Sequence, residues 1–118
     1  MLRIYENYRR VALEIRRRYA LKCDELTLIS SDFRRRDGLL GLSLAMWLAD
    51  KGRCIIIYGL PATNEEELVP LLREKPNVRF LNSPWDKEGI CRAYNELRAP
   101  WLPHNALPNP KAKKTKNP

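Results

Sequence analysis

Three consecutive arginines, Arg34-Arg35-Arg36, are the residues whose type and spacing point most directly to chemistry. A guanidinium group is planar and presents paired donors that match the oxygens of a phosphate or a carboxylate. Asp32 and Asp37 flank the run, and these carboxylates suit pairing with arginine or capping of a following helix. We expect Arg34, Arg35 and Arg36 to contact an RNA or nucleotide phosphate. Pairing with a carboxylate on a neighbouring protein and a merely solvated loop are the alternatives.

The elements on either side of this run predict a βαβ unit. Thr27-Leu28-Ile29 is a short apolar strand, Gly38 to Lys51 is an apolar block of helix length, and Cys54 to Tyr58 is a second buried strand. In such units a ligand phosphate usually sits on the helix N-terminus, where glycines let the backbone approach it. Here the loop from Ser30 to Gly38 holds one glycine and three arginines. We predict that the fold is kept and that the phosphate pocket is lost, with Met46 and Trp47 in the core.

The remaining segments predict two more helices, an N-terminal helix and one more strand, which makes three strands in all. Apolar residues recur at helical spacing from Ile4 to Tyr19, so this segment reads as an amphipathic helix of about four turns. Arg16 and Arg17 on its polar face are either contacts to a phosphate backbone or solvated side chains. A helix is expected from about Asn64 to Lys75 and a strand over Val78–Leu81. A last helix, capped by Ser83, is expected to end near Arg98.

Composition narrows the class of partner. The formal net charge is +8 and the pI is about 9.7, which favours an anionic partner. The three cysteines stand far apart, which argues against a disulfide framework or a zinc site and favours a reducing intracellular compartment. The longest apolar block, Leu39 to Leu48, is too short to cross a bilayer, so no membrane insertion is expected. Glu6 and Glu14 within the arginine-rich N-terminus favour a folded helix over a transit peptide.

The composition changes abruptly after residue 98. Residues 99–118 are rich in proline and lysine and hold almost nothing to bury, so we expect an extended tail there. Trp101 is its expected apolar anchor, and its lysines are expected to contact phosphates or an acidic surface: Lys111, Lys113, Lys114 and Lys116. His104, the one histidine, has no companion acid, base or nucleophile at a recognisable spacing, so no catalytic residue is expected.

Two blocks of this chain resemble the N-terminal YjeF domain, the family of NAD(P)H-hydrate epimerases and of related domains in mRNA-decapping scaffold proteins. The stretch from Tyr5 to Ala12 is similar to the family's M-E-N-A-G-R-x-V-A helix at Glu, Asn, Arg, Val and Ala. After the strand, Asp37-Gly38-Leu39, Ala45, Leu48 and Gly52 match the family's D-G-L segment and the helix that follows. The resemblance implies a partial Rossmann-like, three-layer α/β fold with a short parallel sheet over residues 1–98.

The departures from the family pattern matter as much as the matches. The family's G-x-G-N-N-G-G loop lies against its cofactor, but here those positions hold Ser30, Asp32, Phe33 and the three arginines. The family's later half, with its catalytic lysine and aspartate, has no counterpart after about Leu81. A weaker resemblance, of Leu40-Gly41-Leu42-Ser43 to DHH-type phosphoesterases, lacks the histidine and clustered aspartates that hold two metals.

These observations predict a non-catalytic structural subunit of a large assembly, most plausibly a ribonucleoprotein such as a divergent mitochondrial ribosome. Its expected partners are RNA and other protein subunits, with no cofactor, no metal and no small-molecule ligand. The first alternative is a free-standing RNA-binding or scaffold protein of the YjeF type. The second is a residual epimerase-like enzyme. A mitochondrial location is favoured and a cytoplasmic one remains open.

Overall fold

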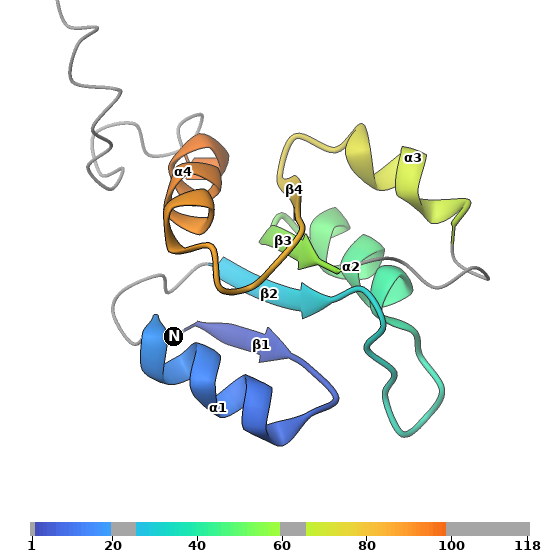
Figure 1. The fold of residues 1–118 in the computed structure, drawn as a ribbon. Helices are drawn as coiled ribbons and strands as arrows, with labels where there is room; N and C mark the ends of the chain where they lie inside the picture. The colour runs from blue at the N-terminus through green and yellow to red at the C-terminus, as the bar shows by residue number, and fades with distance from the viewer. Residues whose placement is uncertain (1, 20–25, 60–65, 99–118) are drawn as a thin grey trace, which may run out of the picture.

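The chain folds as an α/β unit around a four-stranded, all-parallel sheet, in a computed structural model that describes residues 2–19, 26–59 and 66–98 (Figure 1). The strands are β1 (Arg3–Tyr5), β2 (Leu26–Ser30), β3 (Cys54–Tyr58) and β4 (Val78–Leu81), and they lie in the order β1-β2-β3-β4. The helices are α1 (Arg9–Arg18), α2 (Gly41–Asp50), α3 (Leu68–Arg73) and α4 (Lys87–Arg98). Strands and helices alternate along the chain, as parallel pairing requires. The expected βαβ unit is confirmed as β2-α2-β3, with Leu28 opposite Ile56.

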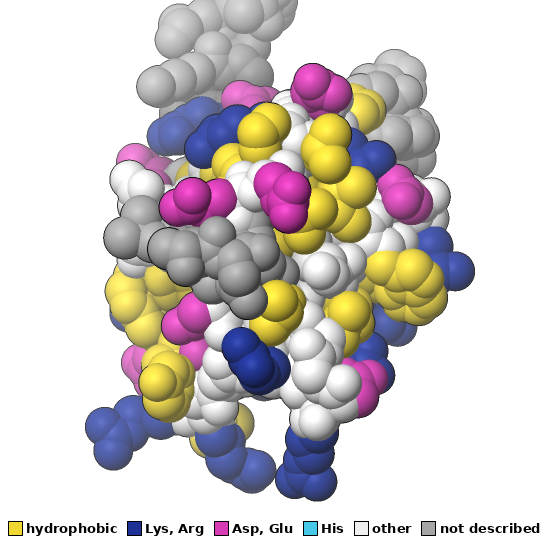
Figure 2. Space-filling view, turned by 90° about the vertical axis from the view of Figure 1, so that its right-hand side faces the viewer, with side chains coloured by type: hydrophobic (Ala, Val, Ile, Leu, Met, Phe, Trp, Pro, Cys, Tyr) yellow, Lys and Arg dark blue, Asp and Glu magenta, His cyan; other side chains and the backbone are white. Residues whose placement is uncertain are grey.

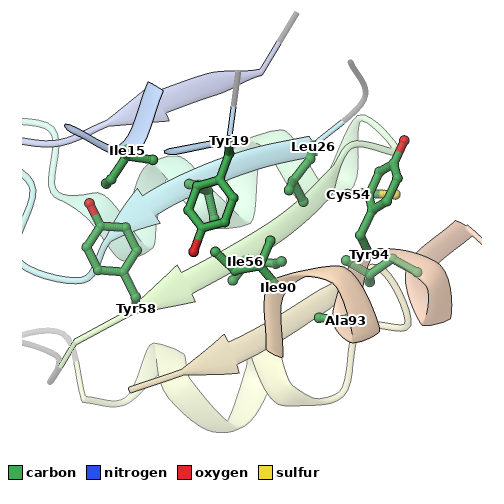
Figure 3. Packing of buried hydrophobic residues seen from close by; sticks show 11 residues of the cluster. Ile15, Tyr19, Leu26, Cys54, Ile56, Tyr58, Ile90, Ala93 and Tyr94 are labelled. Carbon is green, nitrogen blue, oxygen red and sulfur yellow. The ribbon is translucent and has the colours of Figure 1, made fainter. Parts of the chain in front are cut away.

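Two apolar clusters, one on each face of the sheet, place the helices in two layers. Alternate residues of the central strands point to opposite faces. Leu26 of β2 and Ile56 of β3 pack with Ile15 of α1 and with Ile90 and Tyr94 of α4 (Figure 3). The residues of the opposite face pack with α2 and α3: Ile29, Ile55 and Ile57 of the strands with Leu42, Leu48 and Leu72 of the helices. The sheet is therefore covered on both faces, which explains why every residue of β2 and β3 is buried rather than every second one.

The helices change face between the first and second connections. The β1-α1-β2 and β2-α2-β3 connections move across the sheet in the same direction, yet they pass over opposite faces. The first connection therefore has the opposite hand to the two that follow it. The change of face lies between the carboxyl ends of β1 and β2, the edge toward which the arrows point in Figure 1 and onto which Figure 2 looks.

The expectation of one long N-terminal helix was wrong. Residues 3–5 form β1, which pairs in parallel with β2 (Ile4 opposite Leu28), and the helix starts only at Arg9. Tyr8 before it has an extended backbone (φ −97°, ψ 113°) and is 65% exposed. The apolar residues of a three-residue strand happened to continue the helical spacing. The strand forms because β2 offers it a hydrogen-bonding edge, which a local pattern does not contain.

Three smaller expectations also need correction. The second helix begins at Gly41 instead of Gly38. Trp47 is 56% exposed and lies on the outer side of α2, where the Lys51 ammonium is 4.6 Å from its ring centroid, while Met46 packs partly against the core as expected. The last helix is capped by Asp86, whose carboxylate accepts from Gly89 N at 2.8 Å, while Ser83 accepts from Trp85 N in the preceding turn.

Candidate nucleic-acid interface at the carboxyl edge of the sheet

The carboxyl ends of β1 and β2 form the part of the fold most suited to a ligand. After β1 the chain turns to one face of the sheet, and after β2 it turns to the other. Such a point of divergence leaves a crevice in open parallel sheets, and ligands bind there as a rule. Glu6 and Asn7 follow β1, and residues 31–40 follow β2, so these two segments build the candidate site.

The three arginines lie on an ordered turn that we call the arginine hairpin, residues 34–40. Arg34 and Leu40 form an antiparallel bridge, and Arg35 N donates to the Leu39 carbonyl at 2.9 Å. Gly38 N donates to the Arg35 carbonyl at 2.9 Å, and Gly38 takes a φ of +91° that favours glycine. The hairpin carries the arginines away from the start of α2. The helix dipole disfavours arginine at the N-terminus of a helix. This effect acts only within the first turn, so it is small for arginines on the hairpin.

Asn7 ties the arginine hairpin to the end of β1. Its amide Nδ2 donates to the Asp32 carbonyl at 2.9 Å, and its Oδ1 accepts from Arg34 N at 3.1 Å. Both ends of one side chain are thus engaged by the loop that follows β2. Asn7 fixes the position of the hairpin relative to the sheet, and the sequence identified it only through the family resemblance.

Gly41 lets α2 begin directly against the end of β2. A Cβ atom there would lie 2.7 Å from the Ser30 carbonyl oxygen and 3.3 Å from Phe33 Cβ. Close packing of a helix against its strand is one role of glycine in nucleotide-binding βαβ units. The packing glycine is therefore present here, while the positions that would let a backbone meet phosphate carry side chains.

A small polar network lies beneath the site. The buried Tyr58 hydroxyl donates to Glu6 Oε1, and Ser30 Oγ donates to Asp32 Oδ1. Burial, then the hydrogen bond to Glu6 and the negative charges of Glu6 and Asp32, raise the pKa of Tyr58 well above its ordinary value. Tyr58 is thus a hydrogen-bond donor and not a base at neutral pH. The network holds the turn after β1 in place.

The side chains around the arginine hairpin enclose an open hollow of about 500 Å³, lined by Glu6, Asn7 and residues 33–37. Arg35 pairs with Asp37 at 3.1 Å, so part of its charge is compensated. Arg34 and Arg36 are exposed and have no carboxylate partner among residues 2–19, 26–59 and 66–98. In Figure 2, Lys and Arg side chains project from the lower rim of this edge of the molecule. Two guanidinium groups are thus available to an external anion.

The structure does not bring Arg16 and Arg17 to this site. Both are exposed on the last turn of α1, and Arg17 pairs with Glu14. The helix places them roughly 10 Å farther along its axis than Arg9. Arg9 and Arg10 begin α1 two residues after Asn7, so they are the exposed arginines of this helix nearest in the chain to the residue that binds the hairpin. Arg9 and Arg10 were expected on the polar face of the helix, but only Arg16 and Arg17 were named as contacts, because the expected helix had no defined start.

Several expected site residues lie outside the described residues. These are the tail anchor Trp101 and the four tail lysines, Lys111, Lys113, Lys114 and Lys116. In the part of the chain that the structure describes, no three His, Cys, Asp or Glu side chains gather as a metal site would require. Cys54 is buried and Cys91 is partly buried, and no disulfide joins them.

Two further findings bear on the class of protein. Of the helices described, none has the length and apolar character needed to cross a membrane. A scan of protein-family models and searches of curated proteins and solved structures found no match to this chain, so its function has to be argued from its own residues.

Proposed function

We propose that this chain is a non-catalytic RNA-binding subunit of a larger ribonucleoprotein assembly, and that the arginine hairpin is its RNA contact. The observation that carries the proposal is the pair Arg34 and Arg36. Both are exposed without a carboxylate partner in the described chain, on a hairpin that Asn7 holds in a fixed position. A hairpin whose backbone is already fixed loses less conformational entropy on binding phosphate than a freely moving loop.

The same geometry argues against a cofactor site. Tight binding of a nucleotide phosphate in a βαβ unit relies on glycine backbone that comes within hydrogen-bonding distance of the ligand. Here Arg34 N donates to Asn7 and Arg35 N donates to the Leu39 carbonyl, so these two donors are engaged. A residual epimerase-like enzyme is therefore the weakest of the three readings. The family resemblance itself stays a prediction.

Charge reversal tests the proposal on the full chain. We expect the double substitution Arg34→Glu with Arg36→Glu to release a tagged copy from RNA-containing fractions on native size fractionation of its own cells. Arg92→Glu, an equal change of charge per residue at an exposed position on α4, is the matched control and should remain associated. Retention of the double variant in the RNA-containing fraction would refute a contact through the hairpin.

The same fractionation separates the assembly from the alternatives. A large RNA-containing peak, as a divergent mitochondrial ribosome would give, supports the subunit. A peak at the mass of a monomer or dimer that still binds RNA would support the free-standing RNA-binding protein. A peak that keeps its protein partners after ribonuclease treatment would instead indicate an acidic protein surface. Thermal stabilisation by NAD(P)H would support a residual epimerase-like enzyme, because a ligand that binds the folded state raises the melting temperature of the protein.

A further inference from the structure

We propose that the candidate site recognises single-stranded RNA, with an unpaired base stacked on Tyr8 and the adjoining phosphates on Arg34 and Arg36. This inference rests on the proposed function and names the form of RNA that the site takes. It follows from three features of the carboxyl edge: an exposed aromatic ring on the residue after Asn7, an open hollow that Asn7 helps to line, and arginines that line the same hollow.

The first feature is the ring of Tyr8. It is 65% exposed, the most exposed large apolar side chain among those the structure describes. Tyr8 follows Asn7, which lines the hollow, so its Cα lies about 3.8 Å from that of a wall residue. Its backbone is fixed as well, because Tyr8 N donates to Glu6 Oε2 at 3.2 Å. A ring held at the start of a helix and left in solvent is a ready surface for a base.

The second feature is the hollow itself. It has a volume of about 500 Å³ and is open to solvent along much of its surface, so a flexible chain can reach it. Phe33 forms part of its wall and is held edge-on to Tyr5, with ring centroids 5.6 Å apart. The carboxylates of Glu6 and Asp37 also line it, which disfavours a phosphate deep inside. Phosphates therefore suit Arg34 and Arg36 rather than the part of the hollow next to these carboxylates.

The third feature, Arg34 and Arg36 in the lining of the hollow, leaves the site little capacity to read sequence. The Asn7 amide is engaged at both ends by the loop after β2, and one oxygen of Glu6 accepts from Tyr58 while the other accepts from Tyr8 N. Stacking on an aromatic ring tolerates any base, and arginine–phosphate contacts do not depend on sequence. We expect weak sequence preference and strong salt dependence.

A single strand fits this arrangement better than a duplex. In a helix of paired RNA the faces of the bases are covered by their neighbours, and only unpaired bases stack on protein aromatic rings. The exposed ring of Tyr8 can stack on a base that is turned out of the RNA strand. The arginines alone would bind either form, so Tyr8 is the residue that distinguishes them.

Fluorescence anisotropy with a labelled oligouridine 12-mer and a blunt 12-base-pair RNA duplex tests the inference. Tyr8→Ala should weaken binding of the single strand roughly 5- to 100-fold and leave duplex binding unchanged, whereas Tyr8→Phe should keep both. Leu13→Ala is the matched control, because Leu13 is 53% exposed on the same helix, and it should have no effect. Arg36→Gln should weaken both forms and lower the salt slope by about 0.7 for the single strand.

The outcomes separate this inference from the function on which it rests. If the unaltered chain binds neither RNA at low salt, the proposed function fails. If it binds the duplex as tightly as the single strand, or if Tyr8→Ala binds the 12-mer like the unaltered chain, the function stands and the inference is overturned. Circular dichroism of each variant shows whether it has kept its fold.

Discussion

Gly41→Ala should destabilise the protein although alanine is the better helix former. The added Cβ would lie 2.7 Å from the Ser30 carbonyl oxygen and 3.3 Å from both Cβ and the carbonyl oxygen of Phe33. Two of these three atoms are backbone, so relief requires α2 to move away from the end of β2. Overpacking of this kind costs about 1–3 kcal/mol. The higher helix propensity of alanine offsets up to about 1 kcal/mol of this cost. The free energy of unfolding should therefore fall by roughly 1–2 kcal/mol.

Urea unfolding followed by circular dichroism measures this loss as a lower midpoint at unchanged slope. In a domain of this size, each 1 kcal/mol lowers the melting temperature by about 4–8 °C. Gly89→Ala is the control, because its Cβ would meet only the Asp86 carboxylate, a side chain that can rotate away. We expect that control to stay within about 1 kcal/mol of the unaltered protein, since helix propensity offsets a lost cap. Equal stability of Gly41→Ala and the unaltered protein would refute the packing argument.

Three further predictions concern buried groups. Burial raises the pKa of Tyr19 to about 12, so its neutral hydroxyl, which donates to the Pro84 carbonyl at 2.7 Å, adds stability that is present below pH 10 and lost as the pH rises toward 12. Urea unfolding at pH 8 and pH 11 should show a loss of stability that is smaller for Tyr19→Phe than for the unaltered protein by about 1.4 kcal/mol, because pH 11 lies one unit above the ordinary tyrosine pKa. Asn77→Ala removes bonds of 2.9 and 2.8 Å to two backbone carbonyls and should cost about 2–4 kcal/mol in the same assay; a cost below 1 kcal/mol would contradict it. Leu72 is fully buried on the inner side of α3, and Leu72→Ala should lower the free energy of unfolding by about 2–5 kcal/mol. If Leu71→Ala, at a half-exposed position, lowered it as much, this would be contrary evidence.

Much of the architecture could be predicted because its signals are local. The strands β2 and β3 are short, β-branched or apolar runs between breakers, and a helix-length block with a closing glycine separates them. Such a pattern has few other solutions in a chain of this size. The same pattern also predicts that helices cover both faces of the sheet, because neither side of these strands suits exposure to solvent.

The elements that could not be predicted depend on partners distant in sequence. The strand β1 exists only because β2 presents an edge to it, and its pairing moved the start of α1 from Ile4 to Arg9. Trp47 lies in solvent because α2 packs through the other side of its helical wheel, a choice set by the sheet beneath it. A helix apolar nearly all round gives no local sign of which side is buried.

The candidate site divides in the same way. The sequence by itself determined that the loop after β2 carries arginine where glycine backbone would meet a phosphate, and that the chain is basic. Only the tertiary structure decided that these arginines stand on a hairpin fixed by Asn7, that α1 begins at Arg9, and that Tyr8 is exposed just before it. The reason is physical: residue type sets what a group can bind, whereas pairing of β1 with β2 sets which groups stand together.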